Sequence, residues 1–296
     1  MKYKEIIMKI FAIGEVLWDI YPNKKTLGGA ALNFVAHASQ LGAKSALFSA
    51  VGNDVLGDEV VTVLEGFGVS SKFVKRAEQP TGRVIVTLDE KGIPSYDVLS
   101  DMAYDNVPVS DEDIAAINAE GFDALYFGTL IQRSPVSREA VKKIVREARF
   151  GETICDVNLR VNCYDADSVK FCLENATILK VSLEEEPTLR TFGYYSPADD
   201  SYEAITKAMS AAFSNLKVII LTLGKAGSYA YDVKSGKGYT QGSIGDVVVS
   251  TVGAGDSFAA AWLTSYLGGK SIEDCMYKAA EISGFVVAHV EAVPKY

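Results

Sequence analysis

The stretch from residue 247 to residue 258 carries the groups in this chain that are best suited to chemistry. A β-branched run at 247–252 predicts a strand, which ends at a Gly-Ala-Gly turn (253–255) followed by Asp256 and the predicted helix Ser257–Leu267. The first N–H groups of a helix lack partners within it and lie at the positive end of its dipole, so this turn could bind an anion. A carboxylate beside the anion could accept the proton of an attacking hydroxyl group. The pattern indicates phosphoryl transfer with Asp256 as the base, and an ordinary turn capped by an acidic residue is the alternative.

Two other glycine motifs do not explain this part of the chain. Gly253 and Gly255 begin like a dinucleotide fingerprint, but Phe258 stands at the third glycine position. Residues 269–271 read Gly-Lys-Ser like the end of a P-loop, but Thr264 stands at the position of its leading glycine. A dehydrogenase is therefore disfavoured.

A second set of polar residues lies near the first predicted helix, Ala30–Leu41. Gly28 and Gly29 precede the helix and allow a close approach of the backbone, Asp19 lies upstream, and Asn33 lies one turn into the helix. Short donors and acceptors of this kind suit a ligand with several hydroxyl groups. A glycine cap with a surface aspartate is the alternative interpretation.

Length and composition limit the class of protein. The chain has 296 residues, 48% of them hydrophobic, and a net charge of −9, without a basic block, so nucleic acid is not an expected partner. Its four cysteines include no C-x-x-C pair, which favours a reducing compartment. No apolar run reaches the roughly 18 residues of a membrane span. We expect a cytoplasmic protein with no membrane partner, whose natural start could be Met1 or Met8.

Strands and helices alternate along most of the chain. The predicted strands are Lys9–Ile13, Ser45–Ser49, Leu125–Phe127, Thr153–Asp156, Ala176–Lys180 and Val218–Leu221, and the further predicted helices are Val55–Phe67, Ser137–Arg149, Tyr202–Phe213 and Ile272–Val290. Such alternation predicts an α/β fold, a doubly wound and mostly parallel sheet with helices on both faces. Segments 15–27 and 81–101 break the pattern; a hairpin with its turn at 90–92 is predicted in the second, and together they predict a small β-sheet lid.

Taken together, these segments resemble the ribokinase-like (PfkB) sugar kinase family. The matching blocks, in family order, are Gly28–Asn33, Val51–Asp54 with Gly57, Pro80–Gly82, Asp156–Arg160, Lys180–Glu185, Thr222–Gly224 with Gly227, and Gly253–Asp256. Within the family, Gly14–Asp19, Tyr126–Ser134 and Asn158–Arg160 look most like fructokinases. The resemblance covers nearly the whole chain and implies one ribokinase-like kinase domain over 1–296.

The resemblance also implies roles for the matched residues. Asp256 would be the base, and the N–H groups of Gly253, Ala254 and Gly255 would hold the transferring phosphoryl group. The implied sugar contacts are Asp19, Gly28, Gly29, Asn33 and Arg160, although Arg160 could instead pair with a core carboxylate. The implied ATP contacts are Lys180, Ser182, Thr222, Gly224 and Gly227, and Glu185 would help to place Mg²⁺, through water.

Two positions depart from the family pattern. Ser250 stands where the family usually has an aspartate that serves a monovalent cation site, so weak dependence on K⁺ is expected, and Glu291-Ala292 replaces a Gly-Ala step at the edge of the nucleotide pocket. The sequence thus predicts ATP-dependent phosphorylation of a sugar, with fructose as the first choice. The alternatives are ribose, 2-keto-3-deoxygluconate, a nucleoside or a sugar phosphate as acceptor, or a catalytically silent sensor. The lid strands could pair between two copies to form a homodimer.

Overall fold

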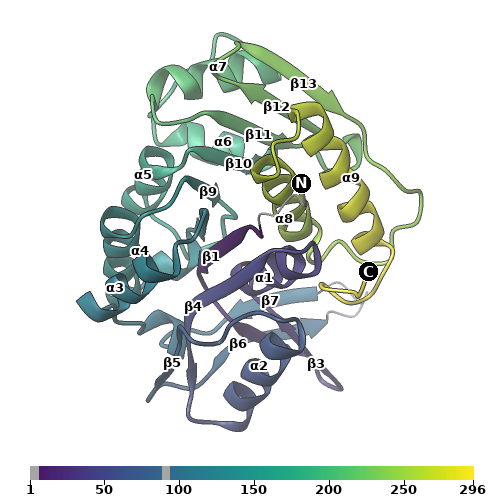
Figure 1. The fold of residues 1–296 in the computed structure, drawn as a ribbon. Helices are drawn as coiled ribbons and strands as arrows, with labels where there is room; N and C mark the ends of the chain where they lie inside the picture. The colour runs from purple at the N-terminus through teal and green to yellow at the C-terminus, as the bar shows by residue number, and fades with distance from the viewer. Residues whose placement is uncertain (1–6, 89–93) are drawn as a thin grey trace, which may run out of the picture.

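A large, mostly parallel sheet forms the centre of the computed structural model, which describes residues 7–88 and 94–296 (Figure 1). Its nine strands run in the order β13-β12-β11-β10-β9-β8-β1-β4-β5. They are β1 (Lys9–Ile13), β4 (Lys44–Gly52), β5 (Val74–Ala77), β8 (Ala124–Gly128), β9 (Glu152–Asp156), β10 (Ile178–Ser182), β11 (Val218–Thr222), β12 (Ser228–Asp232) and β13 (Lys237–Gln241). All neighbours from β5 to β11 are parallel, while β12 and β13 are added antiparallel. The predicted fold class is confirmed.

Helices cover both faces of this sheet. One face carries α1 (Ala30–Gln40), α2 (Val55–Gly66), α8 (Ala254–Leu267) and α9 (Ile272–Val287), and the other carries α3 (Asp111–Glu120), α4 (Pro135–Glu147), α5 (Ala166–Asn175), α6 (Glu186–Thr191) and α7 (Tyr202–Ala212). A hydrophobic core lies between the sheet and the helices on each face. Successive residues of a strand point to opposite faces, so Ile10 and Ala12 of β1 pack in the core under α1 and α8, while Phe11 and Ile13 pack in the core on the other face. Because both faces are covered, the central strands are mostly apolar, with a few buried polar residues such as Asp156 in β9 and Lys180 in β10.

A smaller four-stranded sheet lies beside the large one. Its order is β3-β2-β6-β7, with β2 (Leu17–Ile20), β3 (Lys25–Gly28), β6 (Gly82–Leu88) and β7 (Pro94–Val98). These strands come from the two segments predicted as a lid, whereas the predicted turn at 90–92 lies outside the described residues. Short 3₁₀ helices, η1 (Ala103–Asp105), η2 (Leu130–Arg133) and η3 (Gly224–Ala226), complete the fold.

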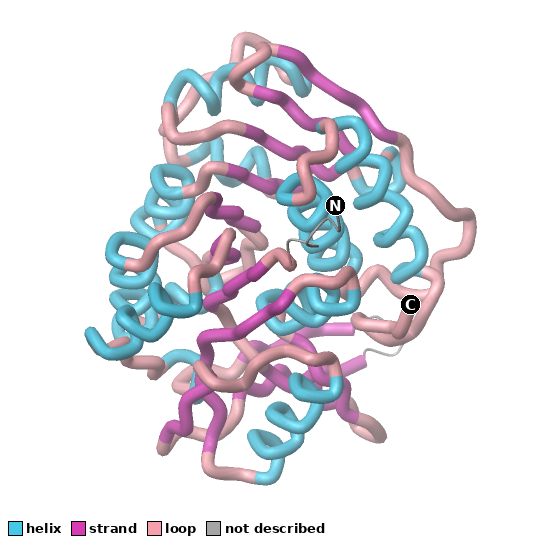
Figure 2. Tube along the Cα trace, in the orientation of Figure 1, coloured by secondary structure: helices cyan, strands magenta, loops and turns pink. Residues whose placement is uncertain are grey.

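The prediction of a strand at 247–252 is wrong. Figure 2 draws the segment between β13 and α8 as a loop. Val247, Val248 and Val249 are 55–67% exposed, and the N–H groups of Val249 and Ser250 donate to the carbonyl of Val287 at the end of α9. A β-branched run favours a strand only where a neighbouring strand can pair with it. In the described part of the chain, this run packs against a helix end instead.

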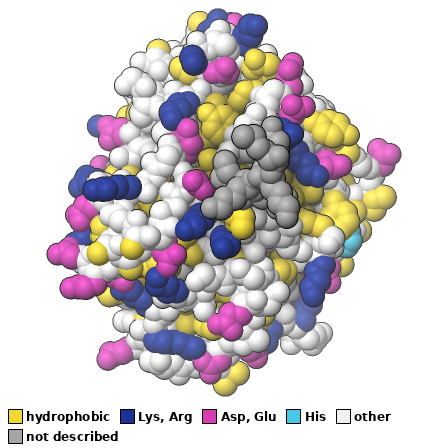
Figure 3. All heavy atoms as spheres, viewed as in Figure 1, with side chains coloured by type: hydrophobic (Ala, Val, Ile, Leu, Met, Phe, Trp, Pro, Cys, Tyr) yellow, Lys and Arg dark blue, Asp and Glu magenta, His cyan; other side chains and the backbone are white. Residues whose placement is uncertain are grey.

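The surface and the helices bear on the expected partners. Acidic and basic side chains are interspersed over the face of the molecule in Figure 3. Among the helices that the structure describes, every one is too short or too polar to serve as a membrane span. All four cysteines are buried as free thiols.

Candidate active site

The predicted anion-binding turn lies where α8 begins. Gly253 is the N-cap with a left-handed φ of 81°, and a Cβ there would overlap the carbonyl oxygen of Ala292, so both conformation and space call for glycine. The helix starts at Ala254, three residues earlier than predicted. Asp256 therefore lies within the first turn of α8, beside the N–H groups that the sequence suggested. Among the described residues the N–H groups of Gly253 and Gly255 have no partner, whereas that of Ala254 donates to the carbonyl of Thr251 at 3.3 Å.

Asp256 is held in place by a residue from the other end of the chain. The Nδ2 of Asn33 in α1 donates to Oδ2 of Asp256 at 2.8 Å, and both side chains are buried. Burial raises the pKa of Asp256 above its ordinary value, while the bond from Asn33 and the charges of Lys180 and Arg160 act in the opposite direction. A buried carboxylate fixed in this way is well suited to accept a proton.

The predicted sugar contacts converge on one cavity of about 380 Å³ next to Asp256. Its lining includes Asp19, Gly28, Gly29, Asn33 and Arg160, together with Gly253 and Gly255 of the turn. Val84, Tyr96 and Val98 of β6 and β7 also line it, so the smaller sheet forms one wall. We refer to it as the acceptor cavity.

Gly29, Asp19 and Arg160 differ in their local environments within this cavity. Gly29 has a φ of 108°, and a Cβ there would overlap the carbonyl oxygen of Glu15. Burial raises the pKa of Asp19, and the charge of Arg160 opposes that effect. Arg160 is exposed and forms no ion pair in the described part of the chain, so pairing with a core carboxylate is not what the structure shows.

A second cavity of about 840 Å³ lies on the other side of the turn. Its lining includes the predicted ATP contacts Ser182, Thr222, Gly224 and Gly227, and its far wall is formed by Ser283, Gly284 and Val287 of α9. It shares Thr251 and Gly255 with the acceptor cavity. The two cavities therefore meet at the anion-binding turn. We refer to this one as the nucleotide cavity.

Three predicted contacts lie elsewhere than expected. Lys180 lines the acceptor cavity, not the nucleotide cavity, and its Nζ donates to Oδ2 of Asp156 at 2.8 Å. Glu185 accepts bonds from the backbone N–H groups of Leu159 and Ser182 at 2.6 and 2.8 Å and lines neither cavity. Ala292, expected at the nucleotide edge, lies against Gly253.

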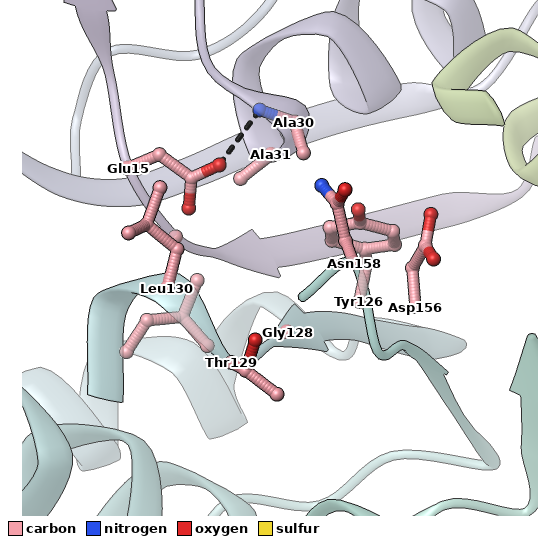
Figure 4. Close-up of a pocket in the computed structure, with 11 residues that line it drawn as sticks. Glu15, Ala30, Ala31, Tyr126, Gly128, Thr129, Leu130, Asp156 and Asn158 are labelled. Atoms are coloured by element: carbon pink, nitrogen blue, oxygen red, sulfur yellow. Dashed lines mark hydrogen bonds between the residues drawn. The ribbon is translucent and has the colours of Figure 1, made fainter. Parts of the chain in front are cut away.

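Glu15 is a site residue that the sequence analysis missed. It is buried two residues after the end of β1, and its Oε1 accepts a bond from the N–H of Ala30 at 2.8 Å (Figure 4). Figure 4 shows it above a small recess that Tyr126, Asp156 and Asn158 also line. Burial raises its pKa to about 7. The available signal was an acidic residue that follows an apolar strand after a single glycine.

Comparisons with known proteins agree with this arrangement. Residues 13–295 match the profile of the pfkB family of carbohydrate kinases. A fructokinase of Vibrio alginolyticus is 27% identical over 84% of this chain and 81% of its own length. The uncharacterized sugar kinase PH1459 of Pyrococcus horikoshii, solved in complex with ATP, is 26% identical with a TM-score of 0.76, over 97% of this chain and 95% of that one. A ribokinase of Arabidopsis thaliana complexed with ribose and ATP has a TM-score of 0.80 at 22% identity, over 98% and 96%.

The chain therefore belongs to the pfkB family of carbohydrate kinases, and its fold is ribokinase-like. The acceptor sugar does not follow from the family. Relatives of similar identity are named as a 6-phosphofructokinase (26%) and a 5-dehydro-2-deoxygluconokinase (28%) as well as a fructokinase (27%).

Proposed function

We propose that this protein transfers the γ-phosphoryl group of ATP to a hydroxyl group of an uncharged sugar, with fructose as the first candidate. The observation that carries the proposal is the meeting of two cavities at one helix N-terminus, with a buried carboxylate beside it. ATP would occupy the nucleotide cavity, and the sugar would lie against Asp19, Gly29 and Asn33.

The reaction needs positioning, a base and neutralisation of charge. The sugar hydroxyl oxygen forms a bond to the γ-phosphorus while the bond to the β–γ bridging oxygen breaks and ADP leaves. Asp256 takes the hydroxyl proton, and the hydrogen bond from Asn33 keeps the Asp256 carboxylate oriented toward the acceptor cavity. The N–H groups of the turn 253–255 would bind the phosphoryl oxygens, that of Ala254 in exchange for its 3.3 Å bond to the carbonyl of Thr251. Donors fixed in advance act there on the charge that develops.

Mg²⁺ would supply charge neutralisation on the nucleotide phosphates. Glu185 fits a contact through water, because each of its carboxylate oxygens accepts one backbone hydrogen bond and keeps a lone pair for a water molecule. Within residues 7–88 and 94–296 no group of three or more His, Cys, Asp or Glu side chains is arranged so that it could hold a metal ion by itself. That arrangement suits an ion held mainly by phosphates and water.

The charge of the acceptor cavity supports an uncharged acceptor. Four carboxyl groups line it (Glu15, Asp19, Asp156 and Asp256), against two cations (Arg160 and Lys180), and with the pKa of Glu15 at about 7 the carboxyl groups still outnumber the cations when Glu15 is left out. Lys180 is already paired with Asp156. A phosphorylated sugar would therefore meet more negative than positive charge. The fructokinase relative and the fructokinase-like segments then support fructose.

The smaller sheet would act as a lid over the sugar and exclude water as a competing acceptor. Its outer strands β3 and β7 each pair on one side only within the described residues, so a second copy could pair there. Sedimentation at micromolar concentration tests the homodimer, and a monomer would remove that part of the proposal alone.

The acceptor is tested with a panel of fructose, ribose, 2-keto-3-deoxygluconate, adenosine and fructose 6-phosphate, each with ATP and Mg²⁺. Release of ADP gives kcat/KM for each compound. We expect fructose to lie within about tenfold of the best acceptor. A different acceptor that is faster by more than that would remove fructose and leave the kinase assignment intact, whereas no ADP release together with sugar binding would favour a sensor.

The base is tested with Asp256→Asn, which keeps the size of the side chain but cannot take the proton. We expect kcat to fall by about 10²–10⁴ with an unchanged melting temperature. Asp167→Asn is the matched control, because Asp167 is an acidic residue in the first turn of α5, away from both cavities. A rate near that of the wild type for Asp256→Asn would show that Asp256 only caps its helix.

A further inference from the structure

The buried pair of Asp156 and Lys180 calls for an explanation other than stability. The two residues lie opposite each other in the parallel pair β9–β10, and their exposed fractions are 2% and 5%. Moving two charges out of water is costly, and well-packed apolar side chains often stabilise such a position as well or better. An ion pair between two central strands therefore points to a use for one of its charges.

The ammonium group lies directly against the anion-binding turn. A Cβ built on Gly255 would lie 3.2 Å from Nζ of Lys180, so the glycine leaves the ammonium group beside the backbone of the turn. Lys180 also lines the acceptor cavity with Gly253 and Asp256. A lysine has three N–H donors, and the contacts between described residues use one of them, toward Asp156. Two donors are available to a ligand.

The charge of Lys180 is secured by its neighbours. Burial alone would lower the pKa of the ammonium group, but the carboxylates of Asp156, Glu185 and Asp256 act against burial and hold that pKa above its ordinary value. Lys180 is therefore a cation at neutral pH. Lys180 is 5% exposed, so its effect on a nearby anion is stronger than that of a surface lysine.

We propose that Nζ of Lys180 contacts the phosphoryl group while it moves between the two cavities, and that Asp156 holds the ammonium group in that position. This inference rests on the proposed function and assigns to Lys180 a catalytic role rather than ATP binding. A fixed cation at this place stabilises the charge on the transferring oxygens in the transition state more than it strengthens sugar binding. Asp156 is then a positioning residue.

The alternative is that Lys180 only neutralises Asp156. Lys180→Met alone does not separate the two, because it leaves a buried carboxylate without its partner. The double variant Asp156→Asn/Lys180→Met removes both charges together. If neutralisation is the whole role, this variant should recover kcat to within about tenfold of the wild type. If the ammonium group contacts the phosphoryl group, we expect the double variant to fold and to remain at least about 100-fold slower, with the sugar KM little changed.

The control is Glu152→Gln/Lys217→Met, which removes a cross-strand ion pair near the opposite end of β9. We expect its activity to match that of the wild type. The second readout is affinity for ADP with aluminium fluoride, an analogue of the transferring group, compared with affinity for ADP alone. For the double variant at 156 and 180, a loss of at least tenfold for the first, with the second unchanged, supports the proposal.

The proposed contact between Lys180 and the phosphoryl group would be overturned if the wild type and the double variant bound the fluoride complex with equal affinity. Recovery of kcat in the double variant would overturn it as well. The binding comparison does not need sugar turnover. If the wild type phosphorylates no sugar in the panel, the proposed function fails by itself, and the binding of the fluoride complex still decides the role of Lys180.

Discussion

The buried carboxyl group of Glu15 should make the stability of this protein depend on pH in a distinctive way. Glu15 is 6% exposed, and its pKa is raised from 4.5 to about 7, first by burial and also by the negative charge of Asp256. The bond from the N–H of Ala30 and the charge of Arg160 oppose the shift. Glu15→Gln keeps an oxygen that can accept the bond from Ala30 but never carries a charge.

The sign follows from proton binding. With its higher pKa, the folded protein binds the Glu15 proton more tightly than the unfolded chain does. The resulting stabilisation is therefore complete below about pH 4.5 and is lost as the pH rises through about 7. The step from 4.5 to about 7 corresponds to roughly 3–4 kcal/mol, at about 1.4 kcal/mol per unit of pKa. Glutamine avoids this loss, so the variant should gain stability relative to the wild type as the pH increases.

Urea denaturation at pH 5, 6, 7 and 8 measures the free energy of unfolding of both proteins. We expect the difference between Glu15→Gln and wild type to grow by about 1–3 kcal/mol in favour of the variant from pH 5 to pH 8. Glu174→Gln, at a half-exposed glutamate on α5, serves as the control and should show little such trend. A difference that stays constant, or that grows toward low pH, would refute the reasoning.

Two further predictions concern the acceptor and cation sites. Gly29→Ala should raise the sugar KM at least about tenfold or lower the free energy of unfolding by about 1–3 kcal/mol, because the φ of 108° at Gly29 and the carbonyl of Glu15 leave no place for a methyl group. Sugar kinetics and urea denaturation measure the two quantities, and a variant in which neither changes would contradict this prediction. Replacing K⁺ by tetramethylammonium at fixed Mg²⁺ and ionic strength should change the rate by less than about threefold, because the hydroxyl of Ser250 brings no charge to a monovalent ion. A strong, saturable activation by K⁺ would count against this.

Parts of the fold with a strong local pattern could be predicted from the sequence. The run Val218–Leu221 is at most 2% exposed, and a continuous apolar run is typical of a central parallel strand. The hairpin of β12 and β13 was missed, because β13 lies at the sheet edge and its five residues are exposed or half-buried, so they carry no apolar pattern. At 247–252 the error was the opposite one: a strand was predicted where the structure has a loop, because β-branched residues alone do not show whether a neighbouring strand exists.

The candidate site also has some features that the local sequence predicts and others that it does not. The turn at 253–255 and Asp256 form a local pattern, and the chain alone indicates their chemistry. The bond between Asn33 and Asp256 spans 223 positions of the chain, and the pairing of Lys180 with Asp156 depends on which strands lie side by side. The family resemblance assigned Lys180 to ATP together with the rest of its matching block, 180–185. Its place beside Gly255 follows only from the order of strands in the sheet.

The glycines at 253 and 255 are needed for different physical reasons. Gly253 has a left-handed φ and packs against the carbonyl of Ala292, which is itself fixed by a bond from Nε2 of His37 at 2.9 Å. Gly255 has no such strain, and its lack of a side chain leaves room for the ammonium group of Lys180. The first glycine therefore shapes the turn, and the second admits a cation to it. The same two-glycine spacing would bind an anion without Lys180, but the buried lysine adds a positive charge where the two cavities meet.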